Sequence, residues 1–213
     1  MVCNCYALSL CLPVILWHYA RPLKVCFKIS YDQFSSLKQI IMRLLKSTIH
    51  PDIANLSAKS FTRKATRAIV LNGDNILLLY TNRYHDYSLP GGGIDEGESN
   101  IEGLVRELKE ETGAHNVQNI REFGLYEEFR PWYKNDFDII HMKSYCYVCT
   151  IDEELLEPEL EDHEIDNGMH PVWMNIHQAI SHNESTIANS DKKGLSIVRE
   201  TFLLKLIVDE LIS

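Results

Sequence analysis

The sequence predicts an α/β fold in which a mixed β-sheet lies between helices, and three observations support this prediction. The tripeptide Asn72-Gly73-Asp74 separates two short β-rich runs and is typical of a tight hairpin turn. Residues Ser99 to Thr112 have the apolar spacing of an amphipathic helix. Strand-like runs then continue as far as a helical pattern at Gly194 to Ile212, so strands and helices are mixed along one chain.

The individual elements follow from residue type and spacing. The hairpin strands are expected at Ala65 to Leu71 and Ile76 to Tyr80, and residues 83–97 are expected to form a glycine-rich loop. The next helix has Ser99 to cap its start and Gly113 to end it. Its apolar side is expected to contain Ile101, Leu104, Val105 and Leu108. The later elements are expected as strands near 119–130 and 137–151, an acidic stretch from Asp152 to Asp166, a strand at His170 to Ile176, a helix near His177 to His182 and the long C-terminal helix.

Residues 1–60 are expected to be an N-terminal extension, partly helical and partly without fixed structure, and residues 61–213 the main domain with its C-terminal helices. The apolar segment Tyr6 to Ala20 is shorter than the roughly 20 residues of a membrane span, and no basic residue precedes it as in a signal peptide. Ser35 to Lys46 has helical spacing. Met42 is a candidate for the true start, with residues 1–41 as a mis-assigned upstream extension. The intact mass of the native protein would test that hypothesis.

Composition and charge exclude several classes of protein. The 213 residues are 45% hydrophobic and 24% charged, which excludes a collagen, a rod, a disordered tail and a multi-span membrane protein. The net charge is −9; residues 1–50 hold six basic side chains and one acidic one and sum to +5, which leaves −14 for the remainder. An acidic main domain argues against duplex nucleic acid as a partner and suits a protein that concentrates divalent cations.

Two cysteines, Cys146 and Cys149, form a CxxC motif within an apolar and aromatic run. In a strand, residues three apart point to opposite faces, so the pair cannot bind one metal ion or act as a redox pair on one face. A redox CxxC also needs a helix N-terminus, and a zinc site needs a second pair of ligands. We therefore expect both thiols to pack in the core, and nothing in the sequence indicates an oxidising compartment.

The clearest chemical pattern is a group of carboxylates on the first helix. Glu107, Glu110 and Glu111 stand at i, i+3 and i+4, which places them on one face. Like charges at that spacing repel, and without a basic partner on the same face they would be stabilised by a cation. Oxygen ligands favour Mg²⁺ or Mn²⁺ over zinc. A solvated acidic helix face is the alternative interpretation.

The loop before this helix strengthens the functional interpretation. Gly91-Gly92-Gly93 follows Leu89-Pro90, and glycines let the backbone approach a ligand closely. Such a loop can offer a carbonyl to a metal ion and amides to a phosphate. Glu98 and Arg106 are eight residues apart, a separation that allows an ion pair between loop and helix. A rigid loop, a carboxylate triad and a bracing arginine thus fall within one short segment.

The segment resembles the Nudix box of the Nudix hydrolases. Gly92, five residues, Glu98, seven residues and then Arg106-Glu107-Leu108-Lys109-Glu110-Glu111-Thr112-Gly113-Ala114 match that motif at all seven fixed positions. The departure is Ala114, where the family has a larger aliphatic residue, and this position should pack rather than react. The resemblance implies the family's α/β/α sandwich with a mixed sheet, from about residue 64 to 187 or beyond.

What the resemblance implies is metal-dependent hydrolysis of a nucleoside diphosphate linked to another moiety, or of a nucleoside triphosphate. The family uses Mg²⁺ or Mn²⁺. By position, Glu107, Glu110 and Glu111 would be metal ligands together with the carbonyl of Gly91, while Glu98 and Arg106 would brace the site. A metal-bound water would attack phosphorus. The general base would be Glu110 or Glu111, or else a carboxylate of the acidic stretch. The candidates in that stretch are Glu161, Asp162 and Glu164. The alternative interpretation of the acidic stretch is a run of charged residues that are simply solvated.

Substrate-binding residues are expected on either side of the box. The segment Tyr126 to Tyr133 offers aromatic rings for stacking and an arginine for phosphate. The loop before the helix offers further polar and aromatic groups. The candidates are Arg83, Tyr87, Gly92, Gly93, Phe129, Arg130 and Trp132, and the alternative is that the aromatic ones pack beneath the domain.

Three function classes remain for comparison. The leading one is an active pyrophosphohydrolase of the cytoplasm that acts on a small nucleotide. We expect it to bind neither duplex nucleic acid nor a membrane, and a homodimer is one candidate assembly. The second is a non-catalytic regulatory module that binds a nucleotide; such modules often lose box carboxylates, and this chain keeps them all. The third is an enzyme tethered by residues 6–20, against which the short, proline-broken run argues.

Overall fold

The structure, a computed structural model, describes residues 42–212. Its larger sheet is built on a long antiparallel hairpin of β6 (Gln118–Pro131) and β7 (Ile139–Thr150). β1 (Leu44–Ile49) pairs parallel with β6, and β2 (Ser60–Ile69) pairs parallel with β7. The strand order is β1-β6-β7-β2, so the predicted mixed sheet is confirmed.

A second sheet contains the predicted hairpin. β3 (Leu71–Asn72) and β4 (Asn75–Thr81) pair antiparallel, and Gly73 adopts a positive φ of 58° in the turn between them. β5 (Asp86–Ser88) and β8 (Met169–Asn175) also pair antiparallel with β4. β5 lies inside the segment expected to be wholly loop, because three residues there reach the edge of β4.

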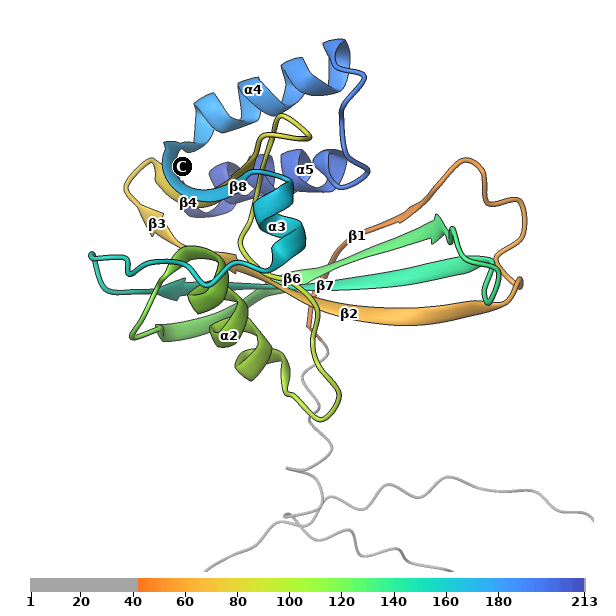
Figure 1. Cartoon of the computed structure of the whole chain (residues 1–213), viewed down its shortest axis with the longest axis horizontal. Coiled ribbons are helices and arrows are strands. Elements are labelled where there is room, and N and C mark those ends of the chain that lie inside the picture. Colours follow the sequence, from red (N-terminus) through yellow and green to blue (C-terminus); the bar gives the residue numbers. More distant parts are fainter. Residues whose placement is uncertain (1–41, 213) are drawn as a thin grey trace, which may run out of the picture. The chain divides into compact units, whose positions relative to one another are not determined.

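Helices cover both sides of these strands (Figure 1). α2 (Asn100–Thr112) lies on one side, while α4 (Ile176–Asn189) and α5 (Ile197–Ile207) lie on the other. The short α3 (Asp162–Asp166) forms within the acidic stretch, and a π-helical turn, η1 (Val208–Ile212), continues α5. The arrangement is the expected α/β/α sandwich. No helix among residues 42–212 is long and apolar enough to cross a membrane.

The core is divided by the strands into two layers. Along β4, Ile76 and Leu78 pack with α4 and α5, whereas Leu77 packs with Leu104 and Leu108 of α2. This alternation is the two-residue period of a strand that is buried on both faces. The same alternation separates the cysteines, which are both free and buried: Cys146 belongs to the first layer and Cys149 to the second. The expectation that both thiols pack in the core is confirmed.

One expectation about local structure is wrong. Ser35 to Lys46 was expected to be helical; residues 35–41 lie outside the described part of the chain, but Leu44–Ile49 is the strand β1. Backbone hydrogen bonds to β6 explain the difference, for example from Leu125 N to Arg43 O at 2.8 Å. A strand of the sheet therefore precedes residue 61. On α2, Leu104 and Leu108 are buried, but Ile101 and Val105 are 39% and 36% exposed.

Candidate functional site

The ends of α2 hold its carboxylates in place. Ser99 and Glu102 form a capping box, in which the Ser99 hydroxyl accepts from Glu102 N and the Glu102 carboxylate accepts from Ser99 N. Gly113 ends the helix with a φ of 70°, and a Cβ there would overlap the carbonyl oxygen of Leu156. Both predicted ends of the helix are confirmed. Ala114, which departs from the usual motif, is fully buried, as expected for a packing position.

The glycine loop is attached to β2 by backbone hydrogen bonds. Thr66 N donates to Gly92 O at 3.0 Å, and Ala68 N donates to Pro90 O at 2.8 Å. Gly91 has a φ of 132°, and a Cβ there would overlap the Thr66 carbonyl oxygen. A Cβ on Gly92 would lie 2.5 Å from the Glu107 carboxylate. Glycine is therefore required sterically where this loop passes β2 and α2.

Arg106 connects the loop to the helix. Its Nε and Nη2 donate to the two oxygens of Glu98 at 2.9 and 3.0 Å, and Nη2 also donates to Gly93 O at 2.8 Å. The predicted ion pair between Glu98 and Arg106 is thus present. The hydrogen bond from Arg106 lowers the pKa of Glu98, and the hydrogen bond from Asp95 N lowers it further by a smaller amount.

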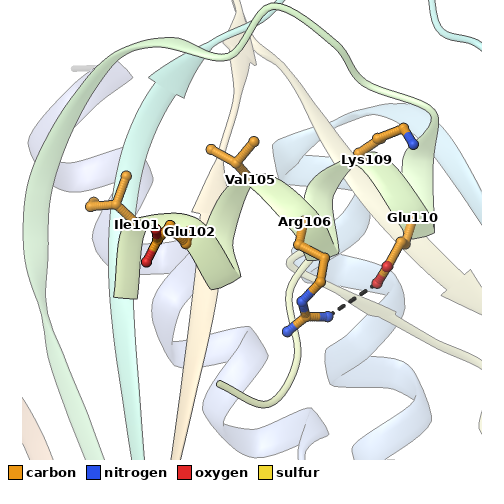
Figure 2. Close-up of a pocket in the computed structure, with 6 residues that line it drawn as sticks. All are labelled: Ile101, Glu102, Val105, Arg106, Lys109 and Glu110. Atoms are coloured by element: carbon orange, nitrogen blue, oxygen red, sulfur yellow. Dashed lines mark hydrogen bonds and ion pairs between the residues drawn. The ribbon is translucent and has the colours of Figure 1, made fainter. Parts of the chain in front are cut away.

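The expectation that the three carboxylates lack a basic partner on their own face is wrong. Arg106 Nη1 lies 2.9 Å from Glu107 Oε1 and 3.1 Å from Glu110 Oε2, and Figure 2 shows the contact with Glu110. An arginine one turn earlier on the helix reaches the same side as Glu110, the ordinary i, i+4 geometry. Arg106 and Glu110 also line a cavity of about 470 Å³ along α2, together with the exposed Ile101 and Val105.

Glu111 is the buried member of the group. It is 5% exposed, and its Oε2 accepts a 2.5 Å hydrogen bond from Gly91 N. Burial raises the pKa of Glu111 to about 8, and the negative charges of Glu107 and Glu164 add to that effect, whereas Gly91 N and Arg67 oppose it. Burial also raises the pKa of Glu107. Beside the glycine loop, therefore, two carboxylates are buried to an extent that disfavours their charged form.

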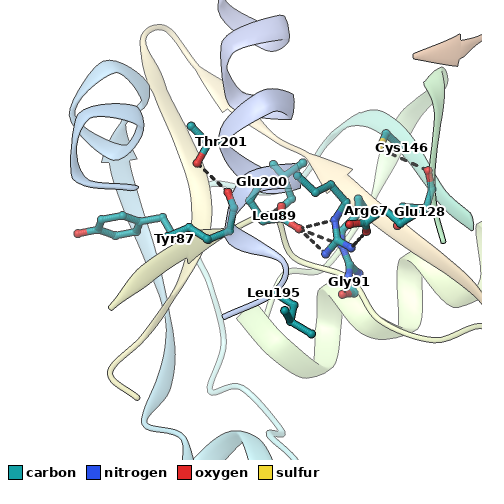
Figure 3. Close-up of polar contacts among 12 residues, drawn as sticks. Arg67, Tyr87, Leu89, Gly91, Glu128, Cys146, Leu195, Glu200 and Thr201 are labelled. Atoms are coloured by element: carbon teal, nitrogen blue, oxygen red, sulfur yellow. Dashed lines mark hydrogen bonds and ion pairs between the residues drawn. The ribbon is translucent and has the colours of Figure 1, made fainter. Parts of the chain in front are cut away.

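Behind the loop lies a network of buried charges that sequence reasoning missed (Figure 3). Arg67 of β2 donates through Nη1 to the carbonyls of Gly91 and Thr66, and its Nε is 3.7 Å from Glu200 Oε1. Glu200 of α5 also accepts from Leu89 N at 3.1 Å and from Arg199 Nη2 at 2.7 Å. The C-terminal helix therefore holds the glycine loop from the side opposite α2.

The same network continues into β6. Arg199 Nη1 donates to Glu128 Oε2 at 2.5 Å, and Arg130 Nη2 donates to Glu128 Oε1 at 2.5 Å. Arg199 and Glu200 are 2% and 0% exposed. Burial alone would raise the pKa of Glu200, but Arg199 and Arg67 outweigh it and lower that pKa. An adjacent Arg-Glu pair inside the apolar pattern of the last helix is the sequence feature that could have indicated this network.

The oxygen atoms near α2 are of the chemical type that binds a hard divalent cation. Glu107 and Glu110 already share one positively charged nitrogen of Arg106, and Glu111 and the Gly91 carbonyl lie along the same loop. These are oxygen donors, three of them anionic, which Mg²⁺ and Mn²⁺ prefer. In the described part of the chain, however, no three acidic, histidine or cysteine side chains converge on one point. Arg106 donates to Glu107 and Glu110, and Arg67 donates to the Gly91 carbonyl.

The acidic stretch lies beside the end of α2. Glu159 N donates to Glu110 O at 2.7 Å, and Leu156 N donates to Gly113 O at 2.9 Å. Of the three candidate bases, Glu161 and Asp162 are exposed, whereas Glu164 is half-buried and accepts from Glu161 N. Glu164 is also the candidate whose charge acts on Glu111. The tertiary structure thus distinguishes Glu164 from its neighbours.

The substrate-binding candidates fall into separate groups. Gly92 and Gly93 contact the carboxylate helix through Glu107 and Arg106, and Arg130 belongs to the buried network. Tyr87 packs against Tyr80 and His182, so its ring has a packing role. The remaining candidates contact other residues: Arg83 donates to Asn167, Phe129 stacks on His141 at 4.1 Å, and Trp132 packs edge-on against Phe61.

Comparison with known proteins gives one family and several relatives. The model of the NUDIX domain matches residues 61–195. An RNA pyrophosphohydrolase of Bartonella quintana is 46% identical over 57 residues, 27% of this chain and 30% of the relative. An RNA pyrophosphohydrolase of Nitratiruptor is 36% identical over 92 residues, 36% of this chain and 56% of the relative. The matched segments thus span between about a third and about half of those relatives.

One solved structure, described as a MutT protein of Bacillus halodurans, has a TM-score of 0.44 and 24% identity. The match covers 56% of this chain and 72% of the Bacillus protein.

Proposed function

This chain belongs to the NUDIX domain family, and from that premise we propose that it is a pyrophosphohydrolase. The substrate would be a nucleoside diphosphate linked to another moiety, or a nucleoside triphosphate, and water would attack phosphorus. The observation that supports this function best is the braced carboxylate helix. Glu107, Glu110 and Glu111 are held against a glycine loop that Arg106 and Glu98 fix to the same helix.

We propose Mg²⁺, or Mn²⁺ in its place, as the cofactor, held by Glu107, Glu110, Glu111 and the Gly91 carbonyl. Such an ion supplies charge neutralisation at the phosphates and acidifies a water molecule. The chain itself contributes position and proton transfer. Arg106 holds the loop through the Gly93 carbonyl, and Arg67 holds it through the Gly91 carbonyl. Glu164 accepts the proton of the attacking water.

The curated relatives indicate one particular class of substrate. They are named RNA pyrophosphohydrolases, and a phosphoanhydride occurs in RNA at a 5′ end that carries two or three phosphates. We therefore add the 5′-triphosphate end of RNA to the small nucleotides as a candidate substrate. The free, buried Cys146 and Cys149 fit a reducing compartment, and we propose the cytoplasm.

A product assay with Mg²⁺ tests the proposal. The panel holds ADP-ribose, dinucleoside polyphosphates, nucleotide sugars, normal and oxidised nucleoside triphosphates, and a 5′-triphosphorylated oligoribonucleotide. Glu110→Gln and Glu111→Gln should each lower turnover at least about 100-fold, as expected when a ligand of a catalytic cation is lost.

Glu102→Gln is the matched control, because Glu102 lies on the same helix and is outside the triad. Its turnover should stay within about twofold of wild type, since a glutamine can still accept from Ser99 N. Near-normal turnover in both triad variants would exclude the proposed metal site. Binding of one nucleotide without cleavage of any would instead favour the regulatory module.

A further inference from the structure

A partly exposed aromatic cluster lies at the edge of the larger sheet, outside the carboxylate site. Phe61, near the start of β2, packs against Trp132 and Phe137 of the loop between β6 and β7, with ring centroids 4.9 Å apart in each case. Tyr133 extends the cluster from Trp132 at 4.4 Å and is 77% exposed. We call these four residues the aromatic platform. Phe61, Trp132 and Phe137 are partly buried against one another, and Tyr133 is the exposed member. A group of aromatic rings that stays open to solvent at the edge of a sheet offers a surface for stacking.

Positive charge surrounds the platform. Lys59 Nζ lies 4.9 Å from the centre of the Phe137 ring, and Lys134 Nζ lies 5.6 Å from that of Tyr133. Arg63 and Lys64 follow on β2, and none of these four cations forms an ion pair with another residue among 42–212. Unpaired cations gathered around aromatic rings in a chain of net charge −9 indicate an anionic partner.

The nearby acidic residues have structural roles in the loop. Asp136 accepts from Trp132 Nε1 at 2.9 Å, and Asp138 accepts from Lys59 N at 3.1 Å. These two carboxylates hold Trp132 in its orientation and close the loop onto β2. The lysine ammonium groups thus lie beside rings whose loop is held in place by these hydrogen bonds.

A cavity of about 570 Å³ lies between Phe61 of the platform and the loop that carries Gly93. Its lining contains the cations Arg63 and Lys64 and the carboxylates Asp95, Glu96 and Glu98. The Arg63 guanidinium lies 3.4 Å from the place of a Cβ on Gly93, whose carbonyl accepts from Arg106. Gly93, which contacts Arg106 of the carboxylate helix, thus lines the same cavity as Arg63, Lys64 and Phe61.

We propose that this surface binds a single-stranded RNA chain whose 5′ end enters the cavity beside Gly93. The inference rests on the proposed function and extends it to the nucleotides that follow the reacting end. Arg63 and Lys64 would contact backbone phosphates, and an unpaired base would stack on Tyr133 beside Lys134. Stacking on aromatic side chains combined with backbone cations is the usual way of binding single strands without sequence preference. A duplex has no unpaired base to offer, in agreement with the acidic main domain.

Equilibrium binding tests the surface separately from catalysis. The probe is a single-stranded octaribonucleotide with a 5′-monophosphate and a 3′ fluorophore, measured by anisotropy with the full chain and Mg²⁺. It contains no phosphoanhydride and so is not a substrate. The variant is Tyr133→Ala combined with Lys134→Glu, both exposed positions. Lys192→Glu is the control, an exposed lysine whose side chain forms no ion pair within the described residues.

We expect the double variant to raise the Kd of the strand at least about tenfold, and the control to leave it within about twofold. Turnover of a nucleoside triphosphate should be unchanged in both, because neither position lies at the carboxylate helix. The wild-type Kd should also rise steeply with salt.

The inference is overturned if the double variant binds as wild type does, or if a duplex of the same sequence binds as tightly as the strand. It is also overturned if the wild-type Kd is weaker than about 100 μM at physiological salt, the weak limit of sequence-independent binding to nucleic acid. Platform-dependent binding without hydrolysis of any substrate would instead remove the proposed function and leave the surface in place.

Discussion

At the scale of single residues, the acidic stretch presents three carboxylates of the same chemistry in different surroundings. Glu161 forms an exposed ion pair with His163, and Asp162 is also exposed. Glu164 is half-buried, and its negative charge contributes, after burial, to the raised pKa of Glu111. A general base must lie near the reacting water. Of the three carboxylates, Glu164 is the one that is half-buried and whose charge acts on Glu111.

Glu164→Gln should therefore lower turnover at least about 100-fold, the smaller end of what a general base contributes. The folded structure should persist, since a glutamine oxygen can still accept from Glu161 N. Steady-state rates with the best substrate of the panel measure the effect. Glu161→Gln serves as the control and should stay near the wild-type rate; equal losses in the two variants would count against a specific role for Glu164.

At the scale of elements, the end of α2 is where the catalytic helix meets the acidic stretch. Gly113 adopts a left-handed conformation, and its missing side chain makes room for the Leu156 carbonyl. Leu156 N and Glu159 N then bond to the carbonyls of Gly113 and Glu110. The same glycine thus ends the helix and lets the segment carrying the candidate base pack against it.

Gly113→Ala should accordingly destabilise the protein by about 2 kcal/mol or more, from left-handed strain plus a steric overlap. Gly73→Ala is the matched control: its φ is 58°, but a Cβ there meets nothing within 4 Å. That variant should lose only about 1 kcal/mol. Urea unfolding compares the two, and equal losses would show that the Leu156 contact is not tight.

At the scale of the whole molecule, buried charges connect elements that are distant in sequence. Glu200 of α5 contacts Arg67 of β2 and the backbone of Leu89, and through Arg199 it reaches Glu128 of β6. The loop that carries Gly91 is held between α2 and this network. A pair of buried charges gives little net stability, but the removal of one partner leaves the other unpaired in the core.

Glu200→Gln should reduce the free energy of unfolding by roughly 3 kcal/mol or more, since Arg67 and Arg199 lose a buried anion. Glu184→Gln tests the specificity of that loss, because the ion pair of Glu184 with Lys205 is about half exposed. It should cost about 1 kcal/mol or less. Thermal and denaturant unfolding give both values; a small effect at Glu200 would mean that water or a shifted side chain replaces the lost contact.

Local features were determined by the sequence alone. The hairpin at Gly73, both ends of α2, the Glu98–Arg106 pair and the opposite placement of Cys146 and Cys149 all follow from residues close together in the chain. Turn chemistry, capping and strand alternation act over a few residues, so a pattern of a few residues predicts them.

Distant contacts were decided by the tertiary structure. Pairing with β6 made Leu44–Ile49 a strand, and folding brought Arg67 to Glu200 and Phe61 to Trp132. Burial separated Glu164 from its exposed neighbours and gave Glu111 its raised pKa. These outcomes depend on desolvation and on contacts between residues up to more than a hundred positions apart. A local pattern such as the Arg199-Glu200 pair can indicate that charges are buried, but it does not determine which distant residues they meet.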